Sequence, residues 1–289
     1  MMLQSTQSSA TRPAQQLSQK SLIETNDGTR LFYQDLGAGQ PVVFIHGWVV
    51  GADIWEYQMS DLPNHVRCIA YDCRGCGRSD QPSNGYDYDT LADDLAALLE
   101  QLDLQNVVLV AHSMGCGEVV RYLSRHGAAR IDRVVLVATN TPFLLRMKDN
   151  PDGFDKQILD DTITELKRDR PRYLAAIAPT FFGTDLSTLS ISPEMMQWGV
   201  GLALRASPKA TIEMMRANFE TDFRPDLHAV TVPTLIIHGD RDQSHPIDVT
   251  GRKTAQLIRG SQFKVYEGAA HGLFITHKEQ FNRDLLAFI

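Results

Sequence analysis

The stretch VLVAHSMGCGEVV, residues 108–120, passes from strand formers to a helical pattern within a few residues. Ser113 lies at the junction, between a run that ends at Ala111 and a helical pattern that begins near Gly115. A sharp strand-to-helix turn lifts the serine hydroxyl above the sheet edge, beside the unpaired N–H groups of a helix N-terminus. Small residues flank the serine because the two backbones pass close together there. The stretch predicts a nucleophilic serine, and the alternative is a serine that only caps an ordinary helix.

Short apolar runs recur along the chain at the spacing of strands. From the third run onward they are nearly continuous in Val, Ile and Leu, which is typical of strands covered on both faces of a parallel sheet. The eight runs are at residues 22–24, 30–36, 42–47, 67–72, 106–111, 133–138, 234–239 and 263–268. The first two can pair as an antiparallel edge. Amphipathic stretches between the runs predict helices at residues 88–104, 117–127 and 280–289.

This alternation predicts an α/β fold with an open, mostly parallel sheet flanked by helices. It is interrupted between about residues 142 and 225, where helical patterns carry Pro and Gly interruptions. We expect this segment, 142–225, to form a helical cap inserted after the sixth strand, with a core of 21–141 and 226–289. Ligands bind at the carboxyl ends of the strands in such sheets, so the cap would roof a pocket. Residues 1–20, rich in Gln, Ser and Ala, are expected to form a disordered tail.

Composition narrows the class of protein. The 289 residues include 43% hydrophobic and 22% charged residues with a net charge of −7, which is ordinary for a globular enzyme. The mild charge gives no reason to expect nucleic acid or an acidic membrane as a partner. No stretch approaches the roughly 20 apolar residues of a membrane span, and the N-terminal segment lacks an apolar run of secretory length. We expect a cytoplasmic protein whose partner is a small molecule.

Cysteine spacing raises one alternative. Cys73 and Cys76 form a CxxC pair, which is compatible with a redox or zinc site. A second pair is missing, and the stretch is typical of a glycine-bearing loop after a strand. We therefore expect free thiols in a reducing compartment, with neither a metal nor a cofactor.

A nucleophilic serine needs a general base, and the base needs an orienting group. In a fold of this kind the acid and the histidine follow the serine in chain order, each on a loop after a strand. The acid loop offers Asp240 and Asp242; we favour Asp242, because Asp240 directly follows the strand and can brace the turn through backbone hydrogen bonds. His271, in a glycine-rich turn after the last strand, is the predicted base. His245 lies near the acid loop, but its position in the chain fits a base poorly.

The tetrahedral intermediate of such chemistry needs hydrogen-bond donors for its oxyanion. The N–H of Met114, directly after the serine, is one candidate, and the N–H of Trp48, in the loop after VVFIHG, is the other. His46 is expected to brace that loop rather than to act in catalysis. Five aromatic residues are candidates to line an apolar substrate pocket: Phe143, Phe181, Phe182, Trp198 and Phe274.

Six strings in a fixed order carry a family resemblance. They are HGW at 46–48, AYDCRGCGRSDQP at 70–82, AHSMGCGEVVRYLSRHG at 111–127, ETDFRPDL at 220–227, VPTLIIHGDRDQ at 232–243 and GAAHGLFITHKEQFNRDLLAFI at 268–289. Over nearly all of residues 21–289 the chain resembles the α/β-hydrolase superfamily, and within it the cofactor-free haloperoxidase, aryl esterase and perhydrolase group. The resemblance implies Ser113, Asp242 and His271 as a catalytic triad. It further implies oxyanion donors at Trp48 and Met114, and relatives of this group often form homo-oligomers.

Three departures from that group bear on function. Ala111 stands where the usual elbow has glycine, and one added methyl group predicts only a small local adjustment. Val49 follows HGW where members with strong perhydrolase character commonly carry proline; proline there would reorient a carbonyl beside the oxyanion site, so its absence favours plain hydrolysis. Ser244 and His245 replace a usually apolar pair, a change for which the sequence suggests no function.

The sequence thus predicts a serine hydrolase that cleaves small, fairly apolar carboxylic esters or lactones through an acyl-enzyme. One alternative keeps the acyl-enzyme and uses hydrogen peroxide in place of water, which yields a peracid. Another, from a different class, is a ligand-binding receptor that retains the fold with negligible turnover.

Overall fold

The computed structural model describes residues 21–184 and 191–289, and the predicted tail at 1–20 lies outside these described residues. Eight strands form one sheet in the order β1-β2-β4-β3-β5-β6-β7-β8. Their bounds are β1 Leu22–Glu24, β2 Arg30–Leu36, β3 Pro41–Ile45, β4 Arg67–Tyr71, β5 Val107–His112, β6 Ile131–Val137, β7 Thr234–Gly239 and β8 Gln262–Tyr266. Each strand coincides with a predicted apolar run to within a few residues. The predicted α/β architecture is confirmed.

Strand direction follows the predicted pattern. β1 pairs with β2, and β2 with β4, in antiparallel register, whereas the pairs from β3 to β8 are parallel. The expectation of an antiparallel edge at the start of the chain is therefore confirmed. All six residues of β5 are buried, as a strand in the middle of a sheet covered on both faces requires.

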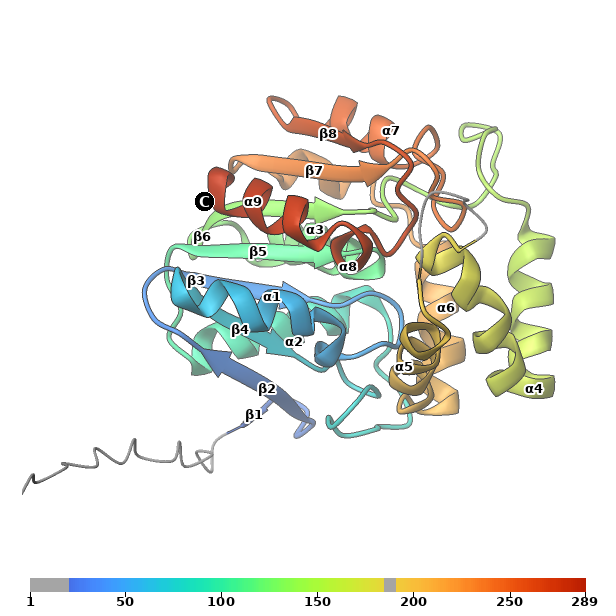
Figure 1. Cartoon of the computed structure of the whole chain (residues 1–289), viewed down its shortest axis with the longest axis horizontal. Helices are drawn as coiled ribbons and strands as arrows, with labels where there is room; N and C mark the ends of the chain where they lie inside the picture. The colour runs from blue at the N-terminus through green and yellow to red at the C-terminus, as the bar shows by residue number, and fades with distance from the viewer. Residues whose placement is uncertain (1–20, 185–190) are drawn as a thin grey trace, which may run out of the picture.

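Helices cover both faces of the sheet (Figure 1). They are α1 Glu56–Asp61, α2 Tyr88–Gln101, α3 Met114–His126, α7 Gly251–Leu257, α8 Leu273–Thr276 and α9 Lys278–Phe288, with 3-10 turns at Ala52–Trp55, Leu62–Asn64 and Asp226–Ala229. Alternate residues of β5 enter different cores, because successive side chains of a strand point to opposite faces. Val107 and Leu109 pack with α2 and α3, whereas Val108 and Val110 pack with α1 and α9. The helices predicted at 88–104, 117–127 and 280–289 correspond to α2, α3 and α9.

Three further helices lie between β6 and β7 in the chain, within the segment predicted to form the cap. They are α4 Lys156–Phe182, α5 Pro193–Leu204 and α6 Pro208–Glu220, and we refer to them as the cap helices. The helix α4 is broken at Asp169, whose φ of −157° is not helical, two residues before Pro171. Ser192 and Ser207 cap α5 and α6, because their side chains accept hydrogen bonds from N–H groups in the first turn of each helix.

The cap helices lie beyond the carboxyl ends of the parallel strands (Figure 1). This is the edge at which open α/β sheets bind ligands. Among residues 21–184 and 191–289, no helix combines the length and the apolar character needed to cross a membrane.

Candidate active site

The turn at Ser113 is as sharp as the sequence predicts. β5 ends at His112 and α3 begins at Met114, so Ser113 alone makes the turn, with φ 53° and ψ −121°. Few residues other than glycine adopt a positive φ, and such strain is typical of functional sites. A Cβ atom on Gly115 would lie 2.7 Å from the carbonyl oxygen of His46, so the close approach of helix and strand requires glycine there. Ala111 keeps regular parallel pairing on both sides of β5, so its methyl group is accommodated within the sheet.

The structure brings the three predicted triad residues together. The Oγ atom of Ser113 lies 2.9 Å from Nε2 of His271, and Nδ1 of His271 lies 2.7 Å from Oδ2 of Asp242. All three residues are buried. With Asp242 ionised, Nδ1 of His271 carries the proton, and Nε2 is then free to accept the proton of the serine hydroxyl.

Asp242 is held ionised by its surroundings. Its Oδ1 atom accepts a hydrogen bond of 2.9 Å from the N–H of His245, and Nε2 of His238 lies 3.3 Å from Oδ2. Burial acts to raise the pKa of Asp242, but His271 and the hydrogen bond from His238 outweigh burial and hold this pKa far below its usual range. Asp240, the alternative acid, instead accepts a hydrogen bond of 2.7 Å from the N–H of Gly268 and so braces the turn.

The loop after β3 passes directly over the nucleophile. A Cβ atom on Gly47 would lie 2.8 Å from Nδ1 of His112 and 3.0 Å from Cβ of Ser113, which leaves room only for glycine. His46 braces this loop: its Nε2 accepts a 3.0 Å hydrogen bond from the N–H of Cys73, and its Nδ1 lies 2.6 Å from the carbonyl oxygen of Gly47. Burial lowers the pKa of His46, so the ring is neutral, as a bracing role requires. The indole N–H of Trp48 donates to the carbonyl of Thr211, 3.0 Å away, and ties the loop to α6.

Both predicted oxyanion donors lie close to Ser113: Met114 follows it in the chain, and Trp48 belongs to the loop that passes over it. Met114 is the first residue of α3, and the first N–H groups of a helix have no partner within it. Trp48 directly follows Gly47, which abuts the serine. Val49, the next residue, has a φ of 54° and is fully buried. Proline could not replace it without a change in the loop, because its ring holds φ near about −65°.

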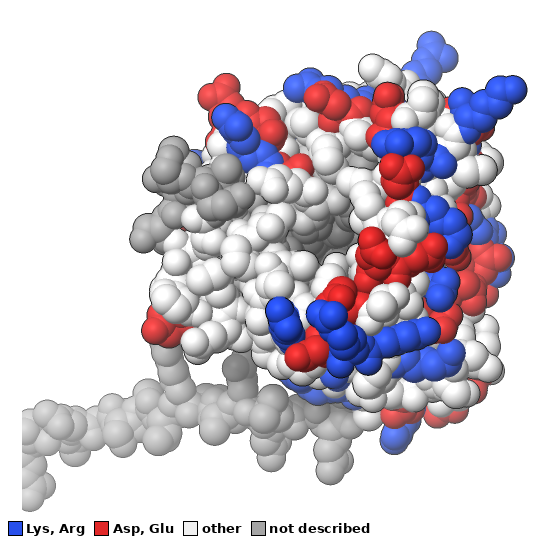
Figure 2. Space-filling model, turned by 90° about the vertical axis from the view of Figure 1, so that its right-hand side faces the viewer, with Lys and Arg blue, Asp and Glu red and all other residues white. Residues whose placement is uncertain are grey.

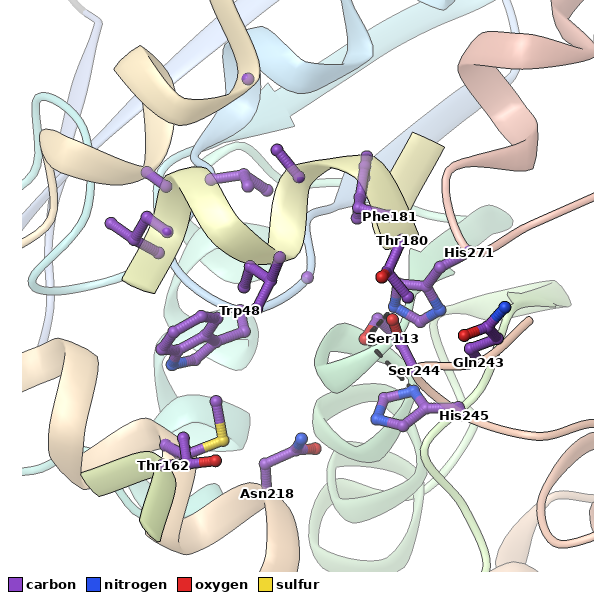
Figure 3. Close-up of a pocket in the computed structure, with 18 of the residues that line it drawn as sticks. Trp48, Ser113, Thr162, Thr180, Phe181, Asn218, Gln243, Ser244, His245 and His271 are labelled. Atoms are coloured by element: carbon purple, nitrogen blue, oxygen red, sulfur yellow. Dashed lines mark hydrogen bonds between the residues drawn. The ribbon is translucent and has the colours of Figure 1, made fainter. Parts of the chain in front are cut away.

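A cavity of about 340 Å³ lies between the strand ends and the cap helices, with Ser113 and His271 in its wall (Figure 3). The face that carries the cap helices is hollowed near its centre, and uncharged side chains border most of the hollow (Figure 2). None of the described lining residues is Asp, Glu, Lys or Arg. Apolar side chains of the cap dominate the wall: Ile158, Leu174, Ile177, Phe181, Phe182, Val200, Met215 and Phe219.

The five aromatic residues predicted to line the pocket divide into two groups. Phe181 and Phe182 line the cavity, but Phe143, Trp198 and Phe274 are not among its described lining residues, so the prediction is wrong for these three. Phe274 lies in the core of the sheet face covered by α9, where its ring centroid is 4.3 Å from that of Trp55. Trp198 packs against the same core from α5. Phe143 is buried beneath the guanidinium of Arg224, 5.4 Å from its ring centroid.

His245 belongs to the site although the sequence suggested no function for it. Its Nδ1 atom lies 3.5 Å from Oγ of Ser113, and its ring lines the cavity beside Ser244 and Gln243 (Figure 3). Burial lowers the pKa of His245 to about 3, so the ring is neutral at ordinary pH. The one feature of the sequence that indicated His245 was the polar pair Ser244 and His245, at positions that are usually apolar in the haloperoxidase, aryl esterase and perhydrolase group.

Comparison with known proteins identifies the family. A family model described as alpha/beta hydrolase fold matches residues 40–278. The chain belongs to the α/β-hydrolase family. This α/β hydrolase is 41% identical to a non-heme chloroperoxidase of Kitasatospora aureofaciens, over 93% of the chain and 98% of that protein. It is 36% identical to a bifunctional esterase/perhydrolase of Acinetobacter calcoaceticus, over 92% of the chain and 98% of the relative. The crystal structure of a bromoperoxidase from Bacillus anthracis superposes with a TM-score of 0.88 at 41% identity, covering 92% and 98% of the two chains.

Proposed function

We propose that this α/β hydrolase is a serine carboxylic-ester hydrolase. The observation that carries the proposal is the continuous set of contacts from Asp242 through His271 to Ser113, at 2.7 Å and 2.9 Å, in the wall of a cavity. The positive φ of Ser113 supports it, because a serine that only caps a helix needs no such conformation. The substrate is a neutral, largely apolar ester or lactone, since the described wall of the cavity carries no charged side chain.

The reaction proceeds in two steps through an acyl-enzyme. Oγ of Ser113 attacks the carbonyl carbon while its proton passes to Nε2 of His271. The N–H groups of Trp48 and Met114 stabilise the oxyanion, and His271 then gives its proton to the leaving alcohol. Water next loses a proton to His271 and attacks the acyl carbon; release of the acid returns the proton to Ser113. Asp242 stays ionised throughout and stabilises the imidazolium.

A second candidate is perhydrolysis, in which hydrogen peroxide attacks the acyl-enzyme and a peracid leaves. The names of two relatives, a chloroperoxidase and an esterase/perhydrolase, support it. The loop at Val49 weighs against it, because its φ of 54° is one that the proline of members with strong perhydrolase character could not adopt. We therefore place hydrolysis first.

The test is hydrolysis of p-nitrophenyl esters from acetate to octanoate by the wild type, Ser113→Ala and Ser60→Ala. Ser60 lies on α1 with its hydroxyl hydrogen-bonded to the carbonyl of Glu56, outside the described cavity wall, and is the matched control. We expect Ser113→Ala to lose at least about a thousandfold in kcat, and Ser60→Ala to match the wild type. Equal, slow rates for all three proteins would favour the receptor alternative. Bromination of an indicator in acetate buffer with peroxide measures the perhydrolase activity.

A further inference from the structure

His245 is held firmly beside the nucleophile. Its backbone N–H donates to Oδ1 of Asp242 at 2.9 Å, and its carbonyl accepts from Nε2 of His238 at 2.8 Å. Its ring stands at 84° to the ring of His271, with centroids 4.8 Å apart. Neither ring nitrogen of His245 takes part in the triad contacts. Because the ring is held so near the reacting atoms, we ask which substrate group it could bind.

The neighbours of Nδ1 determine which nitrogen of His245 carries the proton. Nδ1 lies 3.4 Å from the carbonyl oxygen of Ala138 and 3.5 Å from Oγ of Ser113. The carbonyl can only accept, and the single proton of the serine hydroxyl is directed to His271. Both neighbours therefore favour a proton on Nδ1 of the neutral ring. Nε2 is then left with an unshared electron pair and acts as a hydrogen-bond acceptor.

The second nitrogen of the ring faces the cavity. Figure 3 shows the ring of His245 with one nitrogen toward Ser113 and the other turned into the open space of the cavity. The residues that the structure describes form no hydrogen bond with Nε2. A neutral acceptor in a wall whose described residues include no charged side chain binds a substrate group that donates, and a hydroxyl group is the simplest such donor.

The part of the substrate near His245 follows from the proton transfer. His271 must protonate the leaving oxygen, so the alcohol part of an ester lies against His271. His245 packs on that same ring, whereas the indole ring of Trp48 lies across the cavity (Figure 3). The alcohol part of the ester is therefore the part that reaches Nε2.

We propose that His245 is a specificity-determining residue whose Nε2 accepts a hydrogen bond from a hydroxyl group on the alcohol part of the ester. This inference rests on the proposed ester hydrolysis and deepens it. Monoesters of diols and similar hydroxylated alcohols are then preferred to esters of plain alcohols of the same size. A plain alkyl group would bury the electron pair of Nε2 without a partner, which is unfavourable.

The test compares 2-hydroxyethyl butanoate with propyl butanoate, which differ by a hydroxyl in place of a methyl group. We measure kcat/KM for each ester by acid release and take the ratio of the two values. This ratio is divided by the ratio of the alkaline hydrolysis rates, because the two esters differ in intrinsic reactivity. We expect a wild-type preference for the hydroxyethyl ester of about threefold to tenfold. His245→Asn, whose amide can replace Nδ1 but not Nε2, should abolish it. His245→Gln, whose amide reaches nearer to Nε2, should restore part of it.

A second pair of esters tests whether the alcohol part of the substrate, rather than the acyl part, lies beside Nε2 of His245. Methyl 3-hydroxypropanoate and methyl butanoate carry the same exchange on the acyl part, and His245→Asn should leave their ratio unchanged. A change in this ratio alone would overturn the placement beside the alcohol. A wild-type ratio of one or less for the hydroxyethyl and propyl esters would overturn the role of His245, even if the variants fail to fold. Turnover of p-nitrophenyl butanoate reports separately on the proposed function, and its absence in the wild type would overturn both.

Discussion

Replacing Asp242 with asparagine should nearly abolish activity while the fold persists. The two carboxylate oxygens of Asp242 face donors only: Nδ1–H of His271 at 2.7 Å, the N–H of His245 at 2.9 Å, and Nε2 of His238 at 3.3 Å. Asparagine exchanges one oxygen for an NH₂ group. Whichever way the amide is turned, a donor then faces a donor.

The size of the loss in kcat follows from the way the asparagine amide is oriented. We take the orientation in which its oxygen still accepts the hydrogen bond from the N–H of His245. The NH₂ group then faces Nδ1 of His271, and the ring must give up its Nδ1 proton to accept from the amide. Nε2 becomes protonated and can no longer accept the proton of Ser113. The corresponding loss in a serine protease triad is about 10⁴-fold in kcat. This fall is equivalent to about 5.5 kcal/mol in the activation barrier.

Asp240→Asn is the matched control, two residues away on the same loop. Asp240 is exposed, and among the residues that the structure describes its carboxylate accepts a single hydrogen bond, from the N–H of Gly268 at 2.7 Å, so we expect a change in kcat of less than about threefold. The assay is kcat and KM on p-nitrophenyl butanoate, with thermal unfolding of each variant to show that it is folded. Asp242→Asn with more than a tenth of wild-type kcat, or Asp240→Asn with an equal loss, would refute the reasoning.

Further predictions concern the elbow and a buried carboxyl. Ala111→Gly should keep wild-type kcat and lower the free energy of unfolding by about 1–2 kcal/mol, because it removes a buried methyl and adds a flexible residue within β5. Gly115→Ala should cost more in melting temperature than Ala111→Gly, because its Cβ would lie 2.7 Å from the carbonyl oxygen of His46; a milder effect would contradict the packing described. Burial raises the pKa of Glu118, which is hydrogen-bonded to Tyr71, to about 8. The unfolded value is about 4.3, so the contribution of this carboxyl to stability is complete below pH ~4 and is lost as pH rises toward 8. Glu118 should therefore make the free energy of unfolding fall between pH 5 and 8 by on the order of 1 kcal/mol per pH unit. Urea unfolding of Glu118→Gln should show a fall that is weaker than that of the wild type by this amount. A slope equal to that of the wild type would contradict the prediction.

Much of the fold can be predicted from the sequence because it rests on long, regular patterns. Runs such as 106–111 are covered on both faces, and 88–104 has enough turns for its period to show. The helices α1, α7 and α8 are only 6, 7 and 4 residues long, which is too short for a period to be recognised. Their formation depends on packing against the sheet rather than on local propensity.

The candidate site was predictable only where the chemistry depends on chain order. Ser113, Asp242 and His271 each follow a strand, and a parallel sheet brings the strand ends together. The residues that line the cavity cannot be predicted from chain order in this way. An aromatic residue such as Phe274 is equally suited to the core, where the structure places it. His245 is 132 positions from Ser113 in the chain, and only the fold brings their side chains together.

The central claim is that Ser113 forms a covalent bond with the substrate carbonyl. A p-nitrophenyl alkylphosphonate tests it most directly, because its phosphorus atom traps an activated serine with loss of p-nitrophenol. Intact-mass spectrometry should show one phosphonyl group per chain, and peptide mapping should place it on Ser113, with no adduct in Ser113→Ala. Absence of the adduct from the wild type, or an equal adduct in Ser113→Ala, would contradict the account.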